Sequence, residues 1–260
     1  YGVISIYDKE VYRNPYKNVE ATEVKNIDLS PQQSKAYDTY SNMLLNGGGS
    51  GLLYGVTGSG KTQVYLKLID KALEINKDVI VLVPEISLTP QALSIFHSRY
   101  GNKVAVFHSG LSLGERNDEY KRADRGEAKI VIGTRSAVFA PLHNLGLIII
   151  DEEQENTYKS ERTPKYNTKD VAHFRCKYNK ALFLMTSATP SLEAYSNALA
   201  GKYVLCELNE RFGDAKLPQV ITVDMKQEMK NGNKSPISSK LKELISETID
   251  NGKQAILLIN

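Results

Sequence analysis

A short glycine-rich segment has the residue types and spacing that bind a nucleoside triphosphate. In GVTGSGKT, Gly55, Gly60, Lys61 and Thr62 fit the pattern G-x-x-x-x-G-K-[ST]. Glycines let backbone N–H groups point at phosphate oxygens, the lysine can reach the β and γ phosphates, and the threonine hydroxyl can bind Mg²⁺. We therefore predict ATP and Mg²⁺ as cofactors and Lys61 as a catalytic residue. The other residues of the predicted loop are Val56, Thr57, Gly58 and Ser59.

A pair of acidic residues further along the chain supplies the second half of such a site. Asp151 and Glu152 directly follow the apolar run Leu147 to Ile150. One carboxylate can hold Mg²⁺, and the next can polarise the attacking water as a general base. An acidic loop after a strand is by itself often only a solvated turn, but the glycine-rich segment favours function. We predict Asp151 and Glu152 as catalytic residues and Thr62 with Asp151 as metal ligands.

Alternating strands and helices must position these groups. Continuous apolar runs predict buried parallel strands, and helical segments lie between several of them. This order predicts an α/β domain with a mainly parallel sheet flanked by helices on both faces. The predicted strands are residues 51–54, 79–83, 104–107, 130–132, 147–150 and 182–185. One helix is predicted to start near Ser30, and further helices are predicted over residues 64–75, 89–99, 114–125, 169–177 and 191–200.

Polar clusters follow four of these strands. In parallel sheets ligands bind beyond the carboxyl ends of the strands, so these clusters should share one edge with the glycine-rich loop. The clusters are residues 84–91, 133–136, 151–155 and 186–190. His108 and Ser109 also follow a strand, where the histidine can either cap the chain or meet DNA.

Composition excludes several classes of protein. A chain of 260 residues with 41% hydrophobic residues can bury a core, and its formal net charge of +3 does not by itself indicate a nucleic-acid partner. Two cysteines cannot form a four-cysteine zinc site and are typical of a reducing cytosol. No apolar run reaches the roughly 18 residues of a membrane span. We expect a cytoplasmic protein without membrane contact.

Five segments together resemble the superfamily 2 helicases, and closely the primosomal replication-restart helicases. The resemblance implies a RecA-like P-loop fold. It also implies that residues 1–25 are the tail of an upstream DNA-binding region and linker, 26–225 the first RecA-like lobe with its ATP site, and 226–260 a linker and the start of a second lobe. The segments are GVTGSGKT, LVPEISLTPQ, GTRSAVFAP, IIIDEEQE and SATPSLE.

The same resemblance implies an ATP-dependent helicase that moves 3' to 5' on single-stranded DNA during replication restart. Its implied partners are single-stranded and forked DNA, the primosome and helicase-loading proteins, and we expect a monomer. Zinc is expected only in a part of the protein beyond this chain. Superfamily 2 motors carry transition-state arginines on the second lobe, so this stretch alone should hydrolyse ATP poorly.

Individual roles are carried over from the matching motifs. Gln33 would read adenine, Thr134 and Arg135 would contact the DNA backbone, and Ser187 and Thr189 would couple the nucleotide state to movement. In the acidic motif, Gln154 stands where the family usually has histidine. A glutamine can still hydrogen-bond to other motifs, but it does not titrate.

A basic segment with aromatic residues follows the acidic motif. Residues 156–180 contain seven basic and two acidic residues. Cations and rings together are typical of single-strand binding, and the first half resembles the aromatic-rich loop that links DNA occupancy to hydrolysis in this family. We predict DNA contacts for Tyr158, Lys159, Arg162 and Tyr166. Phe174 and Tyr178, four apart on a predicted helix, are expected in the core.

Two alternatives remain beside a helicase of this family. The chain could act as a nucleotide-gated DNA-binding or scaffold lobe with negligible hydrolysis, or it could belong to another superfamily 2 DNA motor. A small-molecule kinase would leave GTRSAVFAP and the basic segment unexplained.

Beyond residue 217 we expect a structural role for Asp224, a solvated linker over residues 226–234, a helix over 238–249 and a strand over 255–259.

Overall fold

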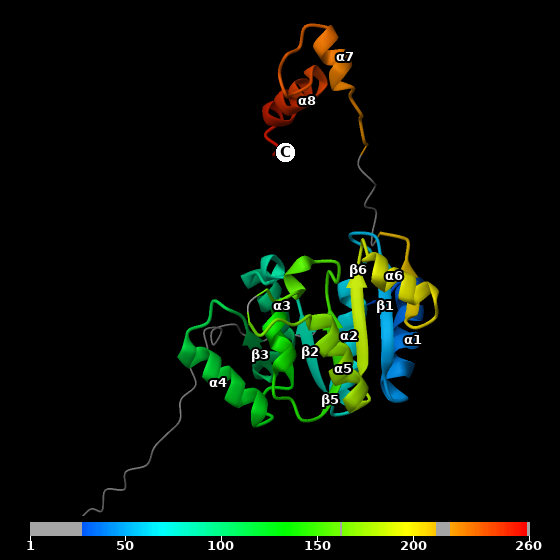
Figure 1. Ribbon diagram of the computed structural model, residues 1–260, viewed down its shortest axis with the longest axis vertical. Helices are drawn as coiled ribbons and strands as arrows, with labels where there is room; N and C mark the ends of the chain where they lie inside the picture. Colours follow the sequence, from blue (N-terminus) through cyan, green and yellow to red (C-terminus); the bar gives the residue numbers. More distant parts are fainter. Residues whose placement is uncertain (1–27, 162, 212–218, 259–260) are drawn as a thin grey trace, which may run out of the picture. The chain divides into compact units, whose positions relative to one another are not determined.

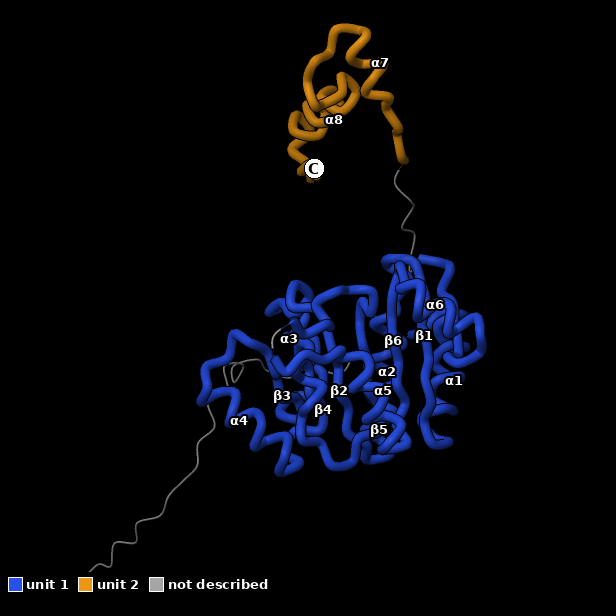
Figure 2. The backbone as a smooth tube through the Cα atoms, in the orientation of Figure 1, with its two compact units in different colours: residues 1–215 blue, residues 216–260 orange. Residues whose placement is uncertain are grey.

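The computed structural model describes residues 28–161, 163–211 and 219–258. Two compact units divide the chain, residues 1–215 and 216–260 (Figure 2). The predicted upstream segment 1–25 and Arg162 lie outside the described residues.

A parallel seven-stranded sheet forms the centre of the first unit, in the order β3-β4-β2-β5-β6-β1-β7 (Figure 1). Every paired neighbour is parallel, which confirms the predicted α/β class. Six of the strands match the predicted apolar runs. The strands are β1 Gly49–Gly55, β2 Asp78–Leu82, β3 Val104–Phe107, β4 Ile130–Gly133, β5 Leu145–Ile150, β6 Leu182–Ser187 and β7 Val204–Leu208.

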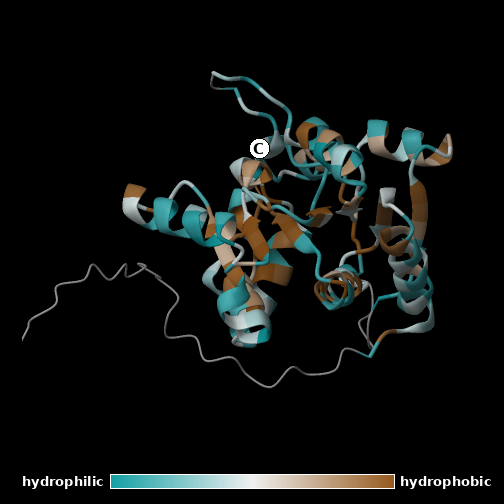
Figure 3. Ribbon diagram, turned by 90° about the horizontal axis from the view of Figure 1, so that it is seen from below, coloured by the Kyte–Doolittle hydropathy of each residue, from teal (hydrophilic) through white to brown (hydrophobic). Residues whose placement is uncertain are grey.

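Helices cover both faces of this sheet. Side chains of α1, α2 and α3 pack in one hydrophobic cluster, and those of α4, α5 and α6 pack in the other. Figure 3 shows the largely hydrophobic strands between these helices. The helices are α1 Pro31–Leu45, α2 Lys61–Glu74, α3 Pro90–Tyr100, α4 Leu113–Asp124, α5 Thr168–Asn179 and α6 Leu192–Leu199, with short 3₁₀ turns η1 Glu85–Ser87, η2 Gly101–Lys103, η3 Arg135–Phe139 and η4 Asn156–Tyr158.

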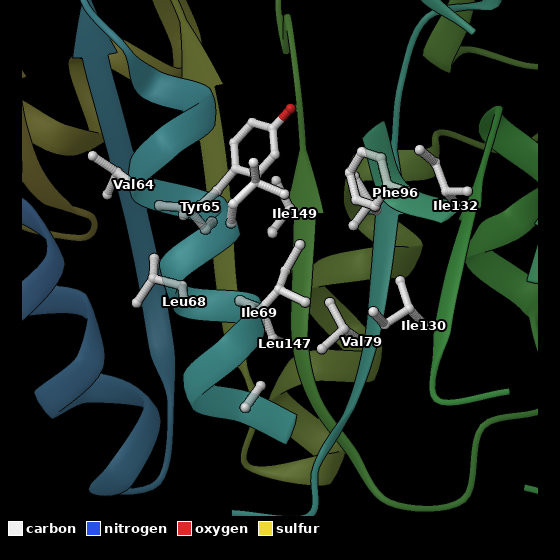
Figure 4. Packing of buried hydrophobic residues seen from close by; sticks show 14 of the residues in the cluster. Val64, Tyr65, Leu68, Ile69, Val79, Phe96, Ile130, Ile132, Leu147 and Ile149 are labelled. Carbon is white, nitrogen blue, oxygen red and sulfur yellow. The ribbon is translucent and has the colours of Figure 1, made fainter. Parts of the chain in front are cut away.

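The first cluster shows how α2 is fixed beneath the glycine-rich loop. Its buried residues Val64, Leu68 and Ile69 recur at helical spacing and pack over apolar side chains of the central strands (Figure 4). Tyr65 belongs to the same cluster, and its hydroxyl points out of the apolar packing (Figure 4). Packing of this kind holds the start of α2 in a fixed position at the carboxyl edge of the sheet.

Two buried charges of α4 cover the outer edge of β3. The Glu119 carboxylate accepts a hydrogen bond from Val106 N at 2.8 Å. Arg122 donates to the carbonyl oxygens of Asn102, at 2.5 Å, and Val104, at 3.2 Å, and pairs with Glu119 at 2.7 Å. Because β3 is the end strand of the sheet, this pair satisfies backbone groups that a further strand would otherwise bond.

The second unit differs from the sequence prediction at two places. Part of the predicted linker 226–234 forms helix α7, Met225–Lys230, because the Asp224 side chain caps it at Lys226 N. Helix α8, Ser239–Asp250, agrees with the prediction. The strand predicted over 255–259 was wrong for residues 255–258, which have no regular structure. A strand needs a hydrogen-bonding partner, and the described part of this unit contains no other strand.

Candidate nucleotide and DNA site

The glycine-rich loop joins β1 to α2 at the carboxyl edge of the sheet. Gly58 and Gly60 have φ values of 80° and 79°, a left-handed conformation that glycine adopts at little cost. Lys61 is buried, and its Nζ donates to Gly55 O at 2.7 Å. Burial lowers the pKa of Lys61, while Glu152 and Asp151 act in the opposite direction. The lysine and the two predicted carboxylates therefore share one electrostatic site.

Gln33 lies directly against this loop. Its Oε1 accepts from Ser30 N at 2.9 Å, which closes a capping box at the start of α1, and its Nε2 donates to Ser59 O at 2.8 Å. A Cβ atom at Gly60 would lie 2.3 Å from Gln33 Nε2, so a larger residue there would displace the Gln33 amide. Reading of adenine by Gln33 stays a prediction.

Asp151 is held from three sides at the end of β5. Its Oδ1 accepts from Thr186 Oγ1 at 2.5 Å and from Glu152 N at 3.1 Å, and Oδ2 lies 3.5 Å from the Tyr65 hydroxyl. Burial raises the pKa of Asp151, and the hydrogen bond from Thr186 partly offsets this. Hard carboxylate and hydroxyl oxygens suit Mg²⁺, so Asp151, with Thr62 at the start of α2, fits the predicted metal role.

A chain of hydrogen bonds leads from Glu152 to the residues after β6. Gln154 Nε2 donates to Glu152 Oε2 at 2.8 Å, and Ser187 Oγ donates to Gln154 Oε1 at 2.6 Å. Thr189 N donates to Ser187 Oγ at 2.9 Å. Glu152 has a φ of 48°, a conformation that is uncommon outside glycine and concentrates at functional sites. Four predicted residues thus form one connected network.

Glu153 ties the acidic motif to both neighbouring helices, a feature that sequence reasoning missed. Its side chain is 0% exposed. Lys169 Nζ lies 2.7 Å from its Oε2, and Ser191, the N-cap of α6, donates to the same carboxylate from its N at 2.5 Å and its Oγ at 3.1 Å. A buried carboxylate with a cation and two donors is satisfied, so Glu153 holds the network in place.

Tyr158 is placed differently from what the sequence favoured. Its ring is 1% exposed, and its hydroxyl donates to Asp151 O at 2.5 Å and Leu82 O at 3.1 Å. A buried ring cannot stack on a base in this conformation. A role in coupling, through the backbone of Asp151, stays a prediction.

The variant Tyr158→Phe tests this placement. It keeps the ring but removes the hydroxyl, so we expect the free energy of unfolding to fall by about 1 kcal/mol. Single-strand affinity should be unchanged, because the hydroxyl bonds two backbone carbonyls of the described residues. Urea unfolding and fluorescence anisotropy with an oligothymidylate measure the two quantities, and a loss of affinity with unchanged stability would contradict the assignment.

The remaining predicted DNA residues flank η3 and the loop before α5. Thr134 is buried at the end of β4, and Arg135 is half-buried and donates to Thr157 O at 3.4 Å. Lys159 is exposed and pairs with Asn167 in an isolated antiparallel bridge. Tyr166 packs edge to face on Phe139 with ring centroids 5.0 Å apart. Direct DNA contact by these residues stays a prediction.

The core position expected for Phe174 and Tyr178 was wrong. These side chains are 70% and 81% exposed on the outer side of α5. The inner side of the helix presents Ala172 and Cys176, and burial raises the pKa of the Cys176 thiol to about 12. Small residues let the helix approach the sheet closely, which leaves the large rings outside.

Residues 26–192 match the protein family described as "Type III restriction enzyme, res subunit". The chain belongs to this family.

Among the described residues, no helix has both the length and the apolar character needed to cross a membrane.

Curated relatives confirm the resemblance to replication-restart helicases. The chain is 45% identical over 260 residues to "Replication restart protein PriA" of Bacillus subtilis, matching 100% of this chain and 32% of that protein. It is 42% identical over 269 residues to the protein of the same name from Synechocystis, matching 100% of the chain and 31% of the relative. It is 46% identical over 211 residues to the protein of the same name from Chlamydia trachomatis, matching 80% of this chain and 28% of the relative. The chain thus spans about a third of these relatives.

Solved structures confirm the fold. "Structure of RecG bound to three-way DNA junction" matches with a TM-score of 0.63 at 22% identity, over 87% of this chain and 28% of that chain. "Crystal Structure of DUF1998 helicase MrfA bound to DNA" matches with a TM-score of 0.51 at 20% identity, over 79% of this chain and 32% of that chain. The seven-stranded sheet with helices on both faces therefore has the RecA-like fold that these two helicase structures share.

Proposed function

We propose that this chain is the ATP-binding lobe of a DNA-stimulated ATPase and helicase that acts in replication restart and moves 3' to 5' on single-stranded DNA. The direction of movement and the biological setting are taken over from the resemblance to the replication-restart helicases. Single-stranded and forked DNA, primosome proteins and helicase loaders are the proposed partners of a cytoplasmic monomer. We also propose that residues 26–225 form the first motor lobe and that a second lobe starts after them.

Each part of the site has a distinct task in this proposal. The loop of residues 55–62 binds the triphosphate, and Lys61 neutralises charge on the β and γ phosphates. Mg²⁺, when bound by Thr62 and Asp151, supplies charge stabilisation at the transferred phosphate. Glu152 accepts a proton from the attacking water as general base.

The observation that carries the proposal is the hydrogen-bonded path from Glu152 through Gln154 and Ser187 to Thr189. It joins the proposed base to the segment after β6, where movement would be sensed. A simple ATP-binding scaffold has no need of a polar connection that reaches the base.

Turnover measurements separate the proposal from its alternative. We expect ATP hydrolysis by this chain to be slow, and that of a longer chain of the same protein, carrying the second lobe, to be strongly stimulated by single-stranded DNA. An arginine supplied from outside a nucleotide site can contribute about 10³ to 10⁵ in rate. Negligible hydrolysis by the longer chain with and without DNA would favour a nucleotide-gated binding lobe instead.

The variant Gln154→His tests the hydrogen-bonded path through pH. A neutral imidazole can accept from Ser187 and donate to Glu152, whereas an imidazolium can only donate. DNA-stimulated turnover of the variant should therefore be retained above a pKa of about 6.5 and should decline as the pH falls below it. The wild-type amide does not titrate in this range, so the ratio of variant to wild-type turnover isolates the effect. A ratio that is independent of pH would contradict the path.

A further inference from the structure

A pocket of about 320 Å³ lies beside the carboxyl ends of β3 and β4. We call it the Phe139 pocket. Its walls come from separate parts of the fold: the residues after β3, the residues from Thr134 through η3, and the outer side of α4. The side chains that carry the argument are Arg116, Tyr120, Arg135 and Phe139, and His108 and Glu85 also line the pocket.

Two aromatic rings of this pocket are widely accessible to solvent. Tyr120 is 48% exposed and Phe139 is 53% exposed, although rings of this size gain free energy by burial. Phe139 is nevertheless held in place, because Tyr166 packs against it at 5.0 Å with the ring planes at 74°. A ring that is exposed on one side and supported on another is suited to stacking with a flat ligand.

The charges on the pocket are suited to phosphate. Two guanidinium groups, those of Arg116 and Arg135, line the pocket, and the lining residues contain a single carboxylate, that of Glu85. Each guanidinium has five N–H donors. Arg116 gives one hydrogen bond to Leu111 O and Arg135 one to Thr157 O, both at 3.4 Å. The exposed hydroxyls of Ser109 and Ser136 add neutral donors at the same lining.

Rings and guanidinium groups together match one ligand chemistry, a nucleotide within a single strand. Every base has a π face, so stacking does not depend on sequence, and arginine binds the flanking phosphates as a planar donor. A purely apolar guest would not use the arginines, and an isolated phosphate would not use the rings.

We propose that the Phe139 pocket captures one base of the bound single strand, which stacks on Phe139 and Tyr120 while Arg116 and Arg135 hold its phosphates. This inference rests on the proposed function, since it adds a base-binding subsite to the DNA path of the same lobe. Tyr166 acts as a positioning residue, because it supports the stacking ring.

Two probes of equal charge test the inference with this chain: an oligothymidylate, and an oligomer of the same length made of abasic residues. We expect Phe139→Ala to weaken binding of the oligothymidylate by roughly 5- to 150-fold in fluorescence anisotropy, the range for loss of one base–ring stack. Binding of the abasic oligomer should be unchanged. Phe139→Tyr should bind both probes as the wild type does, which also controls for folding.

Two further variants make the comparison specific. Phe174→Ala removes an exposed ring from α5, outside this pocket, and should leave both affinities unchanged. Arg116→Ala should weaken both probes by the same factor and reduce the salt dependence of binding, because it removes a phosphate contact.

The outcomes distinguish the inference from the proposed function. If the wild type binds both probes equally and Phe139→Ala does not differ from it, the base-binding pocket is wrong while DNA binding stands. If the wild type binds neither probe, the proposed function fails together with the pocket.

Discussion

Replacing Glu152 by glutamine is expected to reduce ATP turnover by about 10² to 10⁴, the usual contribution of a general base. The amide cannot accept a proton from water, but it has nearly the size of the carboxylate, so nucleotide affinity should be retained. Because Gln154 Nε2 donates to Glu152 Oε2, the new side chain can keep this contact through its amide oxygen. The loss should therefore appear in kcat and not in KM.

Steady-state turnover with single-stranded DNA and binding of a fluorescent ATP analogue, both on the longer chain, measure the two effects. Glu155→Gln is the matched control, because it makes the same change three residues away, outside the hydrogen-bonded path described for Glu152. We expect it to keep wild-type turnover. Normal turnover by Glu152→Gln would overturn the assignment, and Glu153 would be the next candidate base.

The variant Arg122→Ala is expected to cost about 3 to 5 kcal/mol of the free energy of unfolding of the first unit. It would leave Glu119 buried without its cation and would also remove the donor to Asn102 O and Val104 O. Side-chain exposures of 7% and 4% show that both partners are shielded from water in the folded state. Urea unfolding followed by far-ultraviolet circular dichroism measures the loss.

Lys71→Ala provides the control for this variant. Lys71 and Glu74 have the same spacing of three residues on a helix of the same unit, but their side chains are 28% and 63% exposed. Exposed pairs contribute little, so its unfolding midpoint should stay close to that of the wild type. Equal effects of the two variants would show that burial of the Arg122 pair has no energetic consequence.

Strand prediction from the sequence succeeded where burial on both faces leaves a simple pattern. The runs that became β2, β3, β4, β5 and β6 are continuous and apolar, since helices cover each side of them. The strand β7 was missed because it lies at the end of the sheet, carries Glu207 and Cys206, and is only partly buried. Its residues do not show the continuous apolar pattern of an inner strand.

Helical spacing alone misassigned the two faces of α5. Phe174 and Tyr178 lie on one side of the helix, as expected, but the side that meets the sheet is made of Ala172 and Cys176. The spacing of residues along the sequence does not give the distance between the helix and the sheet. This distance decides whether large or small side chains face the sheet.

Within the candidate site, sequence motifs identified the groups but not their connections. The path from Glu152 to Thr189 depends on side chains that are distant along the chain, and only the order of the strands brings β5 next to β6. Tyr158 and Glu153 could not be assigned from residue type, since a tyrosine and a glutamate suit solvent and interior alike. Phe139 was likewise overlooked, although it lies in the segment GTRSAVFAP.

The two hydrogen bonds of the Gln33 side chain have a thermodynamic consequence. One amide completes the cap of α1 and holds Ser59 O in the phosphate loop, so fraying of the first turn of α1 removes a support of the loop. The intact turn supports the loop and so favours nucleotide binding by some coupling free energy. By reciprocity of linked equilibria, nucleotide binding stabilises the turn by that same coupling free energy. Amide hydrogens in this turn then become reporters of nucleotide occupancy, and their exchange should slow as ATP is added.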